Sequence, residues 1–120
     1  TSRVEKEVPL GSSRIDFVLD GIPLEVKGAS LVIDKICLFP DAPTKRGTRH
    51  VREIIEHKGI IVILVLRKAK AWKPFKERDP MFFQAMSEAR KKKIPIIPVQ
   101  ISFDKGNLYY GRNPVRGLLI

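Results

Sequence analysis

The order of apolar and polar residues along the chain predicts β-strands in its first third. The strand-like segments are residues 4–10, 14–19, 22–26 and, less regularly, 31–39. Alternation of the two classes with a period of two is typical of strands whose faces differ. Asp20 and Gly21 separate two of these segments. Because both central residues of a type I′ turn need positive φ, this dipeptide predicts a β-hairpin.

After these strands, the pattern changes to the spacing of an amphipathic helix. Val51, Ile54 and Ile55 would form the apolar stripe of a helix over residues 48–58, and Gly59 stands where a helix C-cap belongs. A loop that contains Pro40, Pro43 and Gly47 precedes this helix.

A second strand–helix–strand unit follows. Residues 60–66 are apolar throughout, as in a strand covered on both faces. Asp79 and Pro80 fit an N-cap followed by proline at the first helical position, and the helix would end in the basic run 90–93. Its apolar face would consist of Phe82, Ala85, Met86 and Ala89. Residues 94–103 return as a strand.

The predicted fold class is therefore α/β, with a mixed β-sheet flanked by helices. The first strands would form an antiparallel meander, and the helical crossovers favour parallel pairing afterwards. A chain of 120 residues fits one domain, here residues 1–120. The chain begins with Thr1. We therefore expect either that an N-terminal segment has been removed or that this is a piece of a longer protein.

The predicted hairpin register places two carboxylates on one face. With a two-residue turn, apolar residues pair on one face in the register Leu19–Ile22, Phe17–Leu24 and Ile15–Val26. On the other face Asp16 lies opposite Glu25, and Arg14 lies opposite Lys27. Like charges directly across a strand pair are destabilising. A divalent cation such as Mg²⁺, which takes one or two carboxylates, would explain the pair.

Lys27 lies two residues beyond Glu25 on the same face, where an ammonium group can stabilise developing phosphate charge. The simpler interpretation is a solvated face on which Arg14 and Lys27 neutralise two surface acids. Asp16 followed by Glu25-Val26-Lys27 after a hairpin resembles the acidic motif of the PD-(D/E)xK nuclease superfamily.

Longer motifs resemble one family in particular. Residues 13–17 (SRIDF) and 24–28 (LEVKG) are similar to the SRIDF and EVKS segments of the sugar fermentation stimulation protein family, with Gly28 in place of a serine. Residues 39–47 (FPDAPTKRG), with His50 and Glu53 after them, resemble its central signature. The resemblance runs over residues 7–99.

The resemblance implies a cytoplasmic DNA-binding protein linked to the regulation of sugar (maltose) metabolism. It implies a PD-(D/E)xK restriction-endonuclease-like core, with the family's N-terminal OB-type domain absent from this chain. Asp16, Glu25 and Lys27 would be catalytic, with Asp16, Glu25 and the Val26 carbonyl holding Mg²⁺ or Mn²⁺. Nucleases of this superfamily also take an acidic residue from a preceding helix, which is not visible here. Glu5 or Glu7 is the substitute to consider.

Composition favours a polyanionic partner. The net charge is +10, with 23 Lys plus Arg against 13 Asp plus Glu. No apolar run approaches the ~20 residues that span a bilayer, so no membrane association is expected. The single cysteine, Cys37, suits a reducing cytoplasm and the role of a small buried hydrophobe.

Two segments outside the hairpin are candidates for nucleic-acid contacts. Arg46 and His50 lie around the start of the first helix, where phosphate binds readily. The alternative there is loop and cap chemistry by Asp41 and Thr44. Placing His57 with His50 and Glu53 as a metal site is not favoured, because the spacing is not that of a zinc helix.

Residues 67–78 would form a basic loop with Trp72 and Phe75 interleaved among its cations. Lys70 and Lys73 could follow a phosphate backbone while Trp72 stacks on bases. The alternative is a solvated loop whose aromatic side chains pack on the core.

The sequence thus predicts a DNA-binding protein with a Mg²⁺-dependent phosphodiesterase site. A non-enzymatic DNA-binding regulator on the same scaffold is the alternative, and an RNA-processing factor is a weaker one. A homodimer is also kept open, since homodimers are common among nucleases.

Overall fold

The computed structural model describes residues 4–10, 13–104, 107–110 and 116–117. Two helices and ten strands lie in this part of the chain. The strands are β1 (Val4–Leu10), β2 (Ser13–Leu19), β3 (Ile22–Ala29), β4 (Leu31–Ile33), β5 (Ile36–Phe39), β6 (Ile60–Val65), β7 (Ala71–Pro74), β8 (Ile96–Asp104), β9 (Asn107–Tyr110) and β10 (Arg116–Gly117). The helices are α1 (Lys45–Glu56) and α2 (Pro80–Lys91).

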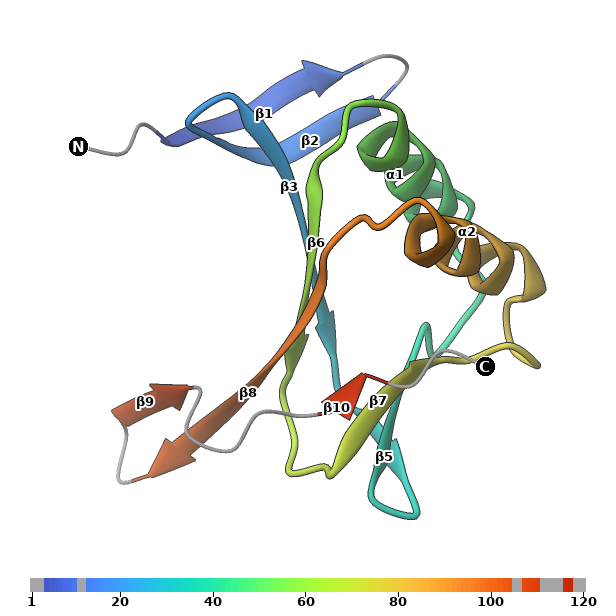
Figure 1. Cartoon of the computed structure of the whole chain (residues 1–120). Helices are drawn as coiled ribbons and strands as arrows, with labels where there is room; N and C mark the ends of the chain where they lie inside the picture. Colours follow the sequence, from blue (N-terminus) through green and yellow to red (C-terminus); the bar gives the residue numbers. More distant parts are fainter. Residues whose placement is uncertain (1–3, 11–12, 105–106, 111–115, 118–120) are drawn as a thin grey trace.

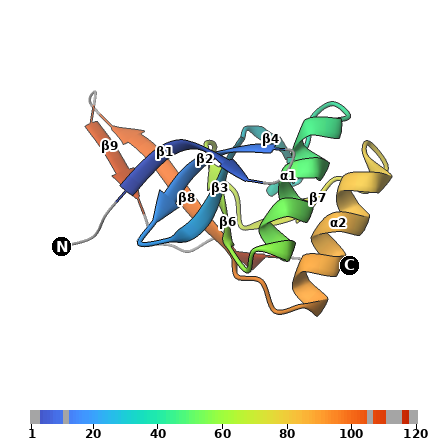
Figure 2. The same cartoon turned by 90° about the horizontal axis from the view of Figure 1, so that it is seen from above.

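The larger sheet has six strands in the order β1-β2-β3-β6-β8-β9. The pairs β1–β2, β2–β3 and β8–β9 are antiparallel, and β3–β6 and β6–β8 are parallel. Both views place α1 and α2 on the same side of this sheet (Figures 1 and 2). The predicted α/β class and mixed sheet are therefore confirmed.

The β2–β3 hairpin forms at the predicted turn. Asp20 and Gly21 have φ values of 51° and 81°, as a type I′ turn requires. The described pairs are Phe17–Leu24, Val18–Pro23 and Leu19–Ile22. Two of the predicted apolar pairs are therefore confirmed. The pairs predicted further from the turn, Asp16–Glu25 among them, are not part of the described register.

The helices cover the face of β3 that the hairpin pattern assigned to polar residues. Pro23, Glu25 and Ala29 are buried, whereas Leu24 and Val26 are only half-buried. The interpretation of a solvated face is therefore wrong for Glu25, whose exposed fraction is 0%. Two-residue alternation fixes which residues share a face, but it does not decide which face the later helices cover.

Strand β6 shows the same difference between faces. Ile61, Ile63 and Val65 are fully buried on the helix side, and the residues between them are half-buried. The prediction that this strand is covered on both faces is therefore only half right. Its uniformly apolar sequence hides the alternation that the structure reveals.

Helix α1 begins at Lys45, three residues earlier than predicted. Thr44 is its N-cap, and the Thr44 hydroxyl accepts a hydrogen bond from the Gly47 amide at 2.8 Å. Cap chemistry is thus confirmed for Thr44. The C-cap is His57 rather than Gly59. A Cβ atom on Gly59 would lie 2.4 Å from the Pro23 carbonyl oxygen, so glycine here permits close approach to β3.

Helix α2 begins as predicted, with Asp79 as N-cap and Pro80 at its first position. The predicted apolar face is also confirmed. Its buried residues are Phe82, Ala85, Met86 and Ala89. The Asp79 carboxylate accepts from the Phe82 amide at 3.1 Å and from the Thr44 amide at 2.8 Å. One buried side chain therefore joins the N-termini of both helices.

A second sheet, in the order β10-β7-β5-β4, was not predicted. The segment 31–39 forms a hairpin, β4–β5, whose turn residues Asp34 and Lys35 both have positive φ. Strand β7 lies within the segment predicted as a basic loop, and it carries Trp72 into the core with an exposed fraction of 0%.

Cys37 is buried, as predicted, and its thiol lies 3.6 Å from the Ala29 carbonyl. Burial raises the pKa of the Cys37 thiol to about 11, which keeps it protonated and unreactive. Neither α1 nor α2, the helices of the described residues, is long and apolar enough to cross a membrane.

Candidate functional site

The candidate site is centred on Glu25, which β3 directs beneath α1. The parallel pairing of β3 with β6 sets Glu25 beside Ile61 and Lys27 beside Ile63. The Glu25 side chain therefore lies in a layer of fully buried aliphatic residues. A carboxyl group in such surroundings is costly unless other groups compensate it.

Two cationic or hydrogen-bonding groups approach the same carboxylate oxygen. The Lys27 ammonium lies 2.8 Å from Oε1 of Glu25, and Nδ1 of His50 lies 3.2 Å from it. The Lys27 side chain is 18% exposed and that of His50 is 2% exposed. Lys27 comes from the same strand, and His50 comes from α1.

The other oxygen of Glu25 has a different environment. Oε2 is buried and has no hydrogen-bond partner among the described residues. Buried carboxylate oxygens are normally satisfied, so an oxygen without a partner calls for a physical explanation. A cation bound at Oε2 would supply the missing contact.

His50 is not placed for the phosphate contact that the sequence predicted. It is buried with its Nδ1 atom toward Glu25, so a direct contact with DNA is not supported. The feature of the sequence that could have predicted the burial of His50 is its position four residues before Ile54, on the apolar stripe of α1. Sequence reasoning found His50 but missed its partner.

Trp72 is also misassigned by the sequence prediction. It lies in β7 within the core, so stacking on a base is wrong for this residue. Phe75 is half-buried, and the Arg78 guanidinium lies 4.8 Å from the centre of its ring. The alternative in which the aromatic residues of this segment pack on the protein therefore holds for Trp72.

The remaining predicted contacts are spread over the surface. Arg46 is exposed in the first turn of α1, Lys70 is exposed before β7, and Lys73 is half-buried in β7. The side chains of Arg14 and Asp16 lie outside the described part of the structure. Val26 is described, but the role of its carbonyl as a ligand stays a prediction.

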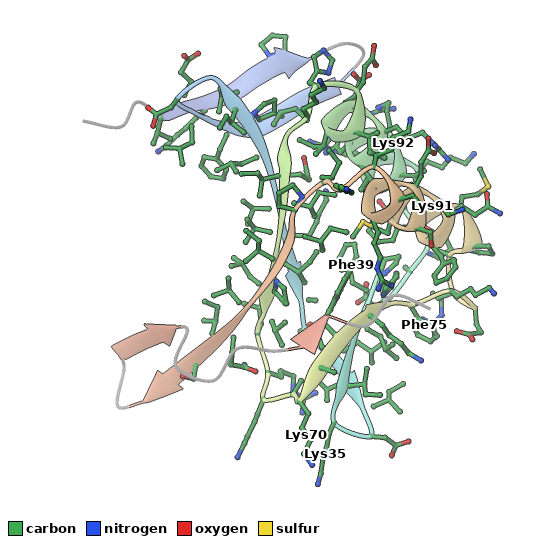
Figure 3. All side chains as sticks on the ribbon, in the orientation of Figure 1. Lys35, Phe39, Lys70, Phe75, Lys91 and Lys92 are labelled. Atoms are coloured by element: carbon green, nitrogen blue, oxygen red, sulfur yellow. The ribbon has the colours of Figure 1, made fainter. Side chains whose placement is uncertain are left out.

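Lysines gather at opposite ends of the molecule (Figure 3). Lys35 and Lys70 lie close together at the β4–β5 turn, where the Lys70 amide donates to the Lys35 carbonyl at 2.8 Å. Lys91 and Lys92 lie at the C-terminal end of α2. Positive charge alone therefore does not single out one nucleic-acid-binding face.

A second group of potential metal ligands lies near the end of α1. One ligand atom from each of Glu53, Glu56 and His57 falls within 4.8 Å of the others. Glu56 and His57 are exposed, and acidic groups of this kind are common on surfaces without a bound ion. This group shares Glu53 and His57 with the set that the sequence analysis did not favour.

Comparison with known proteins decides the family. The profile described as "Sugar fermentation stimulation protein RE domain" matches residues 1–107. The chain belongs to the sugar fermentation stimulation protein family. The resemblance noted in the sequence is thereby confirmed.

Two archaeal relatives and one bacterial relative illustrate the match. A sugar fermentation stimulation protein homolog of Saccharolobus solfataricus is 51% identical over 84 aligned positions, and the match covers 65% of this chain and 35% of that protein. The homolog of Sulfurisphaera tokodaii is 40% identical over 121 residues, covering 95% and 54%. That of Clostridium novyi is 41% identical over 106 residues, covering 79% and 46%.

A solved structure agrees with the family assignment and the fold. It is described as Pyrococcus furiosus SfsA in complex with Ca²⁺, and it matches with a TM-score of 0.89 at 26% identity. The match covers 98% of this chain and 55% of that protein. The matches thus cover about half the length of most of these family members, and about a third of the S. solfataricus one.

Proposed function

We propose that this domain binds DNA and hydrolyses phosphodiester bonds with the help of a divalent cation, Mg²⁺ or Mn²⁺, in the cytoplasm. The observation that carries the proposal is the buried Glu25 carboxylate with Oε1 paired and Oε2 without a partner among the described residues. A buried carboxylate oxygen without a partner destabilises the fold unless a ligand binds it.

The residues present fit a hard divalent cation. Carboxylate and carbonyl oxygens are the ligands that Mg²⁺ and Ca²⁺ prefer, and Glu25 offers a buried one. Asp16 and the Val26 carbonyl complete the set implied by the family motif, with Glu5 or Glu7 as a further acid. A bound cation would polarise a phosphate oxygen and lower the pKa of a coordinated water. The Ca²⁺ in the P. furiosus relative supports a cation in this family.

Lys27 has the position of a residue that acts on the phosphate or on water. Its ammonium contacts Glu25 while 18% of the side chain stays exposed. A partly exposed ammonium beside a buried carboxylate can hold an attacking water or stabilise charge that develops on the phosphate. We assign it that role, with Asp16 and Glu25 as the other catalytic residues.

DNA would be bound mainly through its phosphates. Arg14, Arg46, Lys70 and Lys73 are the contacts that we propose. Arg46 and Lys70 are exposed, as phosphate contacts must be. A net charge of +10 favours association with a polyanion. Binding should therefore weaken steeply as salt rises, and a flat salt response would contradict the assignment.

One observation favours a non-enzymatic regulator as the second candidate. The Glu25 charge is already balanced by Lys27 at 2.8 Å, so the pair could persist without a cation. In that case the scaffold would bind DNA, and regulate genes of sugar metabolism, without cleaving it.

Cleavage of plasmid DNA with Mg²⁺ or Mn²⁺ separates the two candidates. We expect nicking by the wild type and at least a hundredfold slower nicking by Glu25→Gln and Asp16→Ala, with DNA affinity within a few-fold. Glu56→Gln is the matched control, because it removes an acid from the second ligand group. Equal cleavage by wild type, Glu25→Gln and Asp16→Ala would exclude the proposed site.

DNA binding without cleavage by the wild type would instead favour the regulator.

A further inference from the structure

We propose that His50 is a positioning residue that fixes the Glu25 carboxylate so that Oε2 is presented to the cation. The inference rests on the proposed metal site and goes beyond it, because it assigns a role to a residue of α1 rather than of the hairpin. It also replaces the phosphate contact that the sequence predicted for His50.

The carboxylate of Glu25 can rotate about its own side chain. The last torsion of a glutamate side chain is broad, so the plane of the carboxylate turns at little cost. A single contact from Lys27 does not prevent this rotation, because a lysine ammonium sits on a flexible stem with three rotatable donors. With Lys27 alone, the carboxylate plane could turn about that contact and change the direction in which the second oxygen points.

His50 contacts the same carboxylate oxygen as Lys27 does. Nδ1 of His50 lies 3.2 Å from Oε1, the same oxygen that Lys27 contacts at 2.8 Å. Two donors from different elements thus converge on one oxygen. Turning the carboxylate plane away from this orientation would weaken both contacts at once, so the second oxygen, Oε2, keeps its direction and stays without a partner among the described residues.

Helix α1, which carries His50, is held firmly in the fold. Its N-terminus is fixed by the Thr44 cap and by the bond from the Thr44 amide to Asp79. Val51 and Ile54, the neighbours of His50 on the same helix, are fully buried in the core. His50 therefore has little room to move, unlike Lys27. An orienting group that sits on a packed helix is the usual support for a metal ligand.

The test is Ca²⁺ binding measured by isothermal titration calorimetry, with no activity readout. His50→Leu fills a similar volume without a donor, and His50→Asn keeps an amide N–H close to the position of Nδ1. We expect Ca²⁺ affinity to fall about ten- to hundredfold in His50→Leu, as for other groups that orient metal ligands, and to stay within about threefold in His50→Asn. Melting temperatures of both variants report whether each one folds.

His57→Leu serves as the matched control, because His57 belongs to the second ligand group. Loss of Ca²⁺ affinity in His57→Leu but not in His50→Leu would move the cation to Glu53, Glu56 and His57 and overturn the inference. Equal affinity losses in His50→Leu and His50→Asn that follow their melting temperatures would reduce His50 to a packing residue.

The proposed metal site is tested separately by Glu25→Gln. If the wild type binds Ca²⁺ and Glu25→Gln does not, while His50→Leu binds as tightly as the wild type, only the role of His50 fails. If the wild type binds neither Ca²⁺ nor Mn²⁺, the metal site fails as well, and His50 has no ligand to position.

Discussion

The two faces of the six-stranded sheet are built from alternate residues of the same strands. The face covered by helices holds a buried carboxyl group, whereas the more exposed face of β3 carries apolar side chains. On the face covered by helices, Ile61 and Ile63 are fully buried, and Glu25 lies beside them with an exposed fraction of 0%. On the opposite face, Leu24 and Val26 are apolar and only half-buried.

A carboxyl group would be cheapest on the open face, where water can solvate it. On the covered face the Glu25 carboxyl group occupies a buried position that an apolar side chain would fill more favourably. The open face instead exposes large apolar side chains, with exposed fractions of 43% for Ile22 and 45% for Ile97. Stability therefore gives no reason for the placement of Glu25, whereas the proposed metal site would. Each prediction below tests this contrast.

The largest expected change in the free energy of unfolding comes from shortening an apolar side chain on the covered face. Ile63→Ala should lower the free energy of unfolding by about 2–5 kcal/mol, because it leaves a cavity in a closed core. Leu64→Ala, one residue later on the open face, should cost on the order of 1 kcal/mol, because a half-buried side chain leaves no closed cavity. Urea unfolding measures both.

Equal losses in Ile63→Ala and Leu64→Ala would mean that something covers the open face as tightly as the helices cover the other.

The next effect concerns the charged residues of the covered face. Glu25→Leu should lower the free energy of unfolding by about 1–3 kcal/mol, because it leaves the donors of Lys27 and His50 without their acceptor. The double variant Glu25→Leu/Lys27→Leu should recover most of this loss, since replacing both members of a buried ion pair is often neutral or stabilising. A double-mutant cycle in urea measures the coupling.

Recovery in the double variant would indicate that Glu25 and Lys27 are retained for a function rather than for stability. A double variant less stable than Glu25→Leu would give the pair a structural role and weaken the contrast between the two faces.

The sequence predicted strands β1, β2, β3, β6 and β8, both helices and the register next to the turn, because these depend on local patterns. Asp79 and Pro80 begin α2 as predicted, and Asp20-Gly21 forms the hairpin turn. The start of α1 was missed because Gly47, which lies in the first turn of the helix, was assigned to the preceding loop. Only the structure shows that Thr44 is held in place by Asp79, 35 residues later.

The candidate site was predicted in part. The motif located Glu25 and Lys27, but the burial of Glu25 depends on which face α1 covers, and alternation cannot decide that. The contact between Glu25 and His50 joins residues 25 positions apart, and it depends on the rotation of α1 about its axis. Trp72 was misassigned because a four-residue strand amid lysines has too little pattern to be recognised.

A smaller loss of stability is expected for substitutions of Asp79, whose carboxylate joins the N-termini of α1 and α2. Asp79→Ala should lower the free energy of unfolding by about 1–2 kcal/mol, because the amides of Phe82 and Thr44 both lose their acceptor. Asp79→Asn keeps one carbonyl acceptor and should cost less. Thermal unfolding followed by circular dichroism measures both, and a larger loss in Asp79→Asn than in Asp79→Ala would exclude a capping role.

The smallest effect is expected at Glu88, an exposed glutamate that also lies between two basic side chains. Its carboxylate lies 3.2 Å from the Lys92 ammonium and 2.9 Å from the Arg52 guanidinium, and its side chain is 40% exposed. Hydrogen bonds from Lys92 and then Arg52 lower the pKa of Glu88 below its ordinary value.

A carboxyl group whose pKa is lowered in the folded state stabilises that state above its unfolded pKa, and this contribution is lost as the pH falls through the folded pKa. An NMR titration should therefore give Glu88 a lower pKa than a free glutamate, and Lys92→Ala should raise it more than Arg52→Ala. Glu88→Gln should barely change the melting temperature at neutral pH, since exposed ion pairs contribute little. If Glu88→Gln destabilised the protein as much as Glu25→Leu, burial would not be what distinguishes the two glutamates.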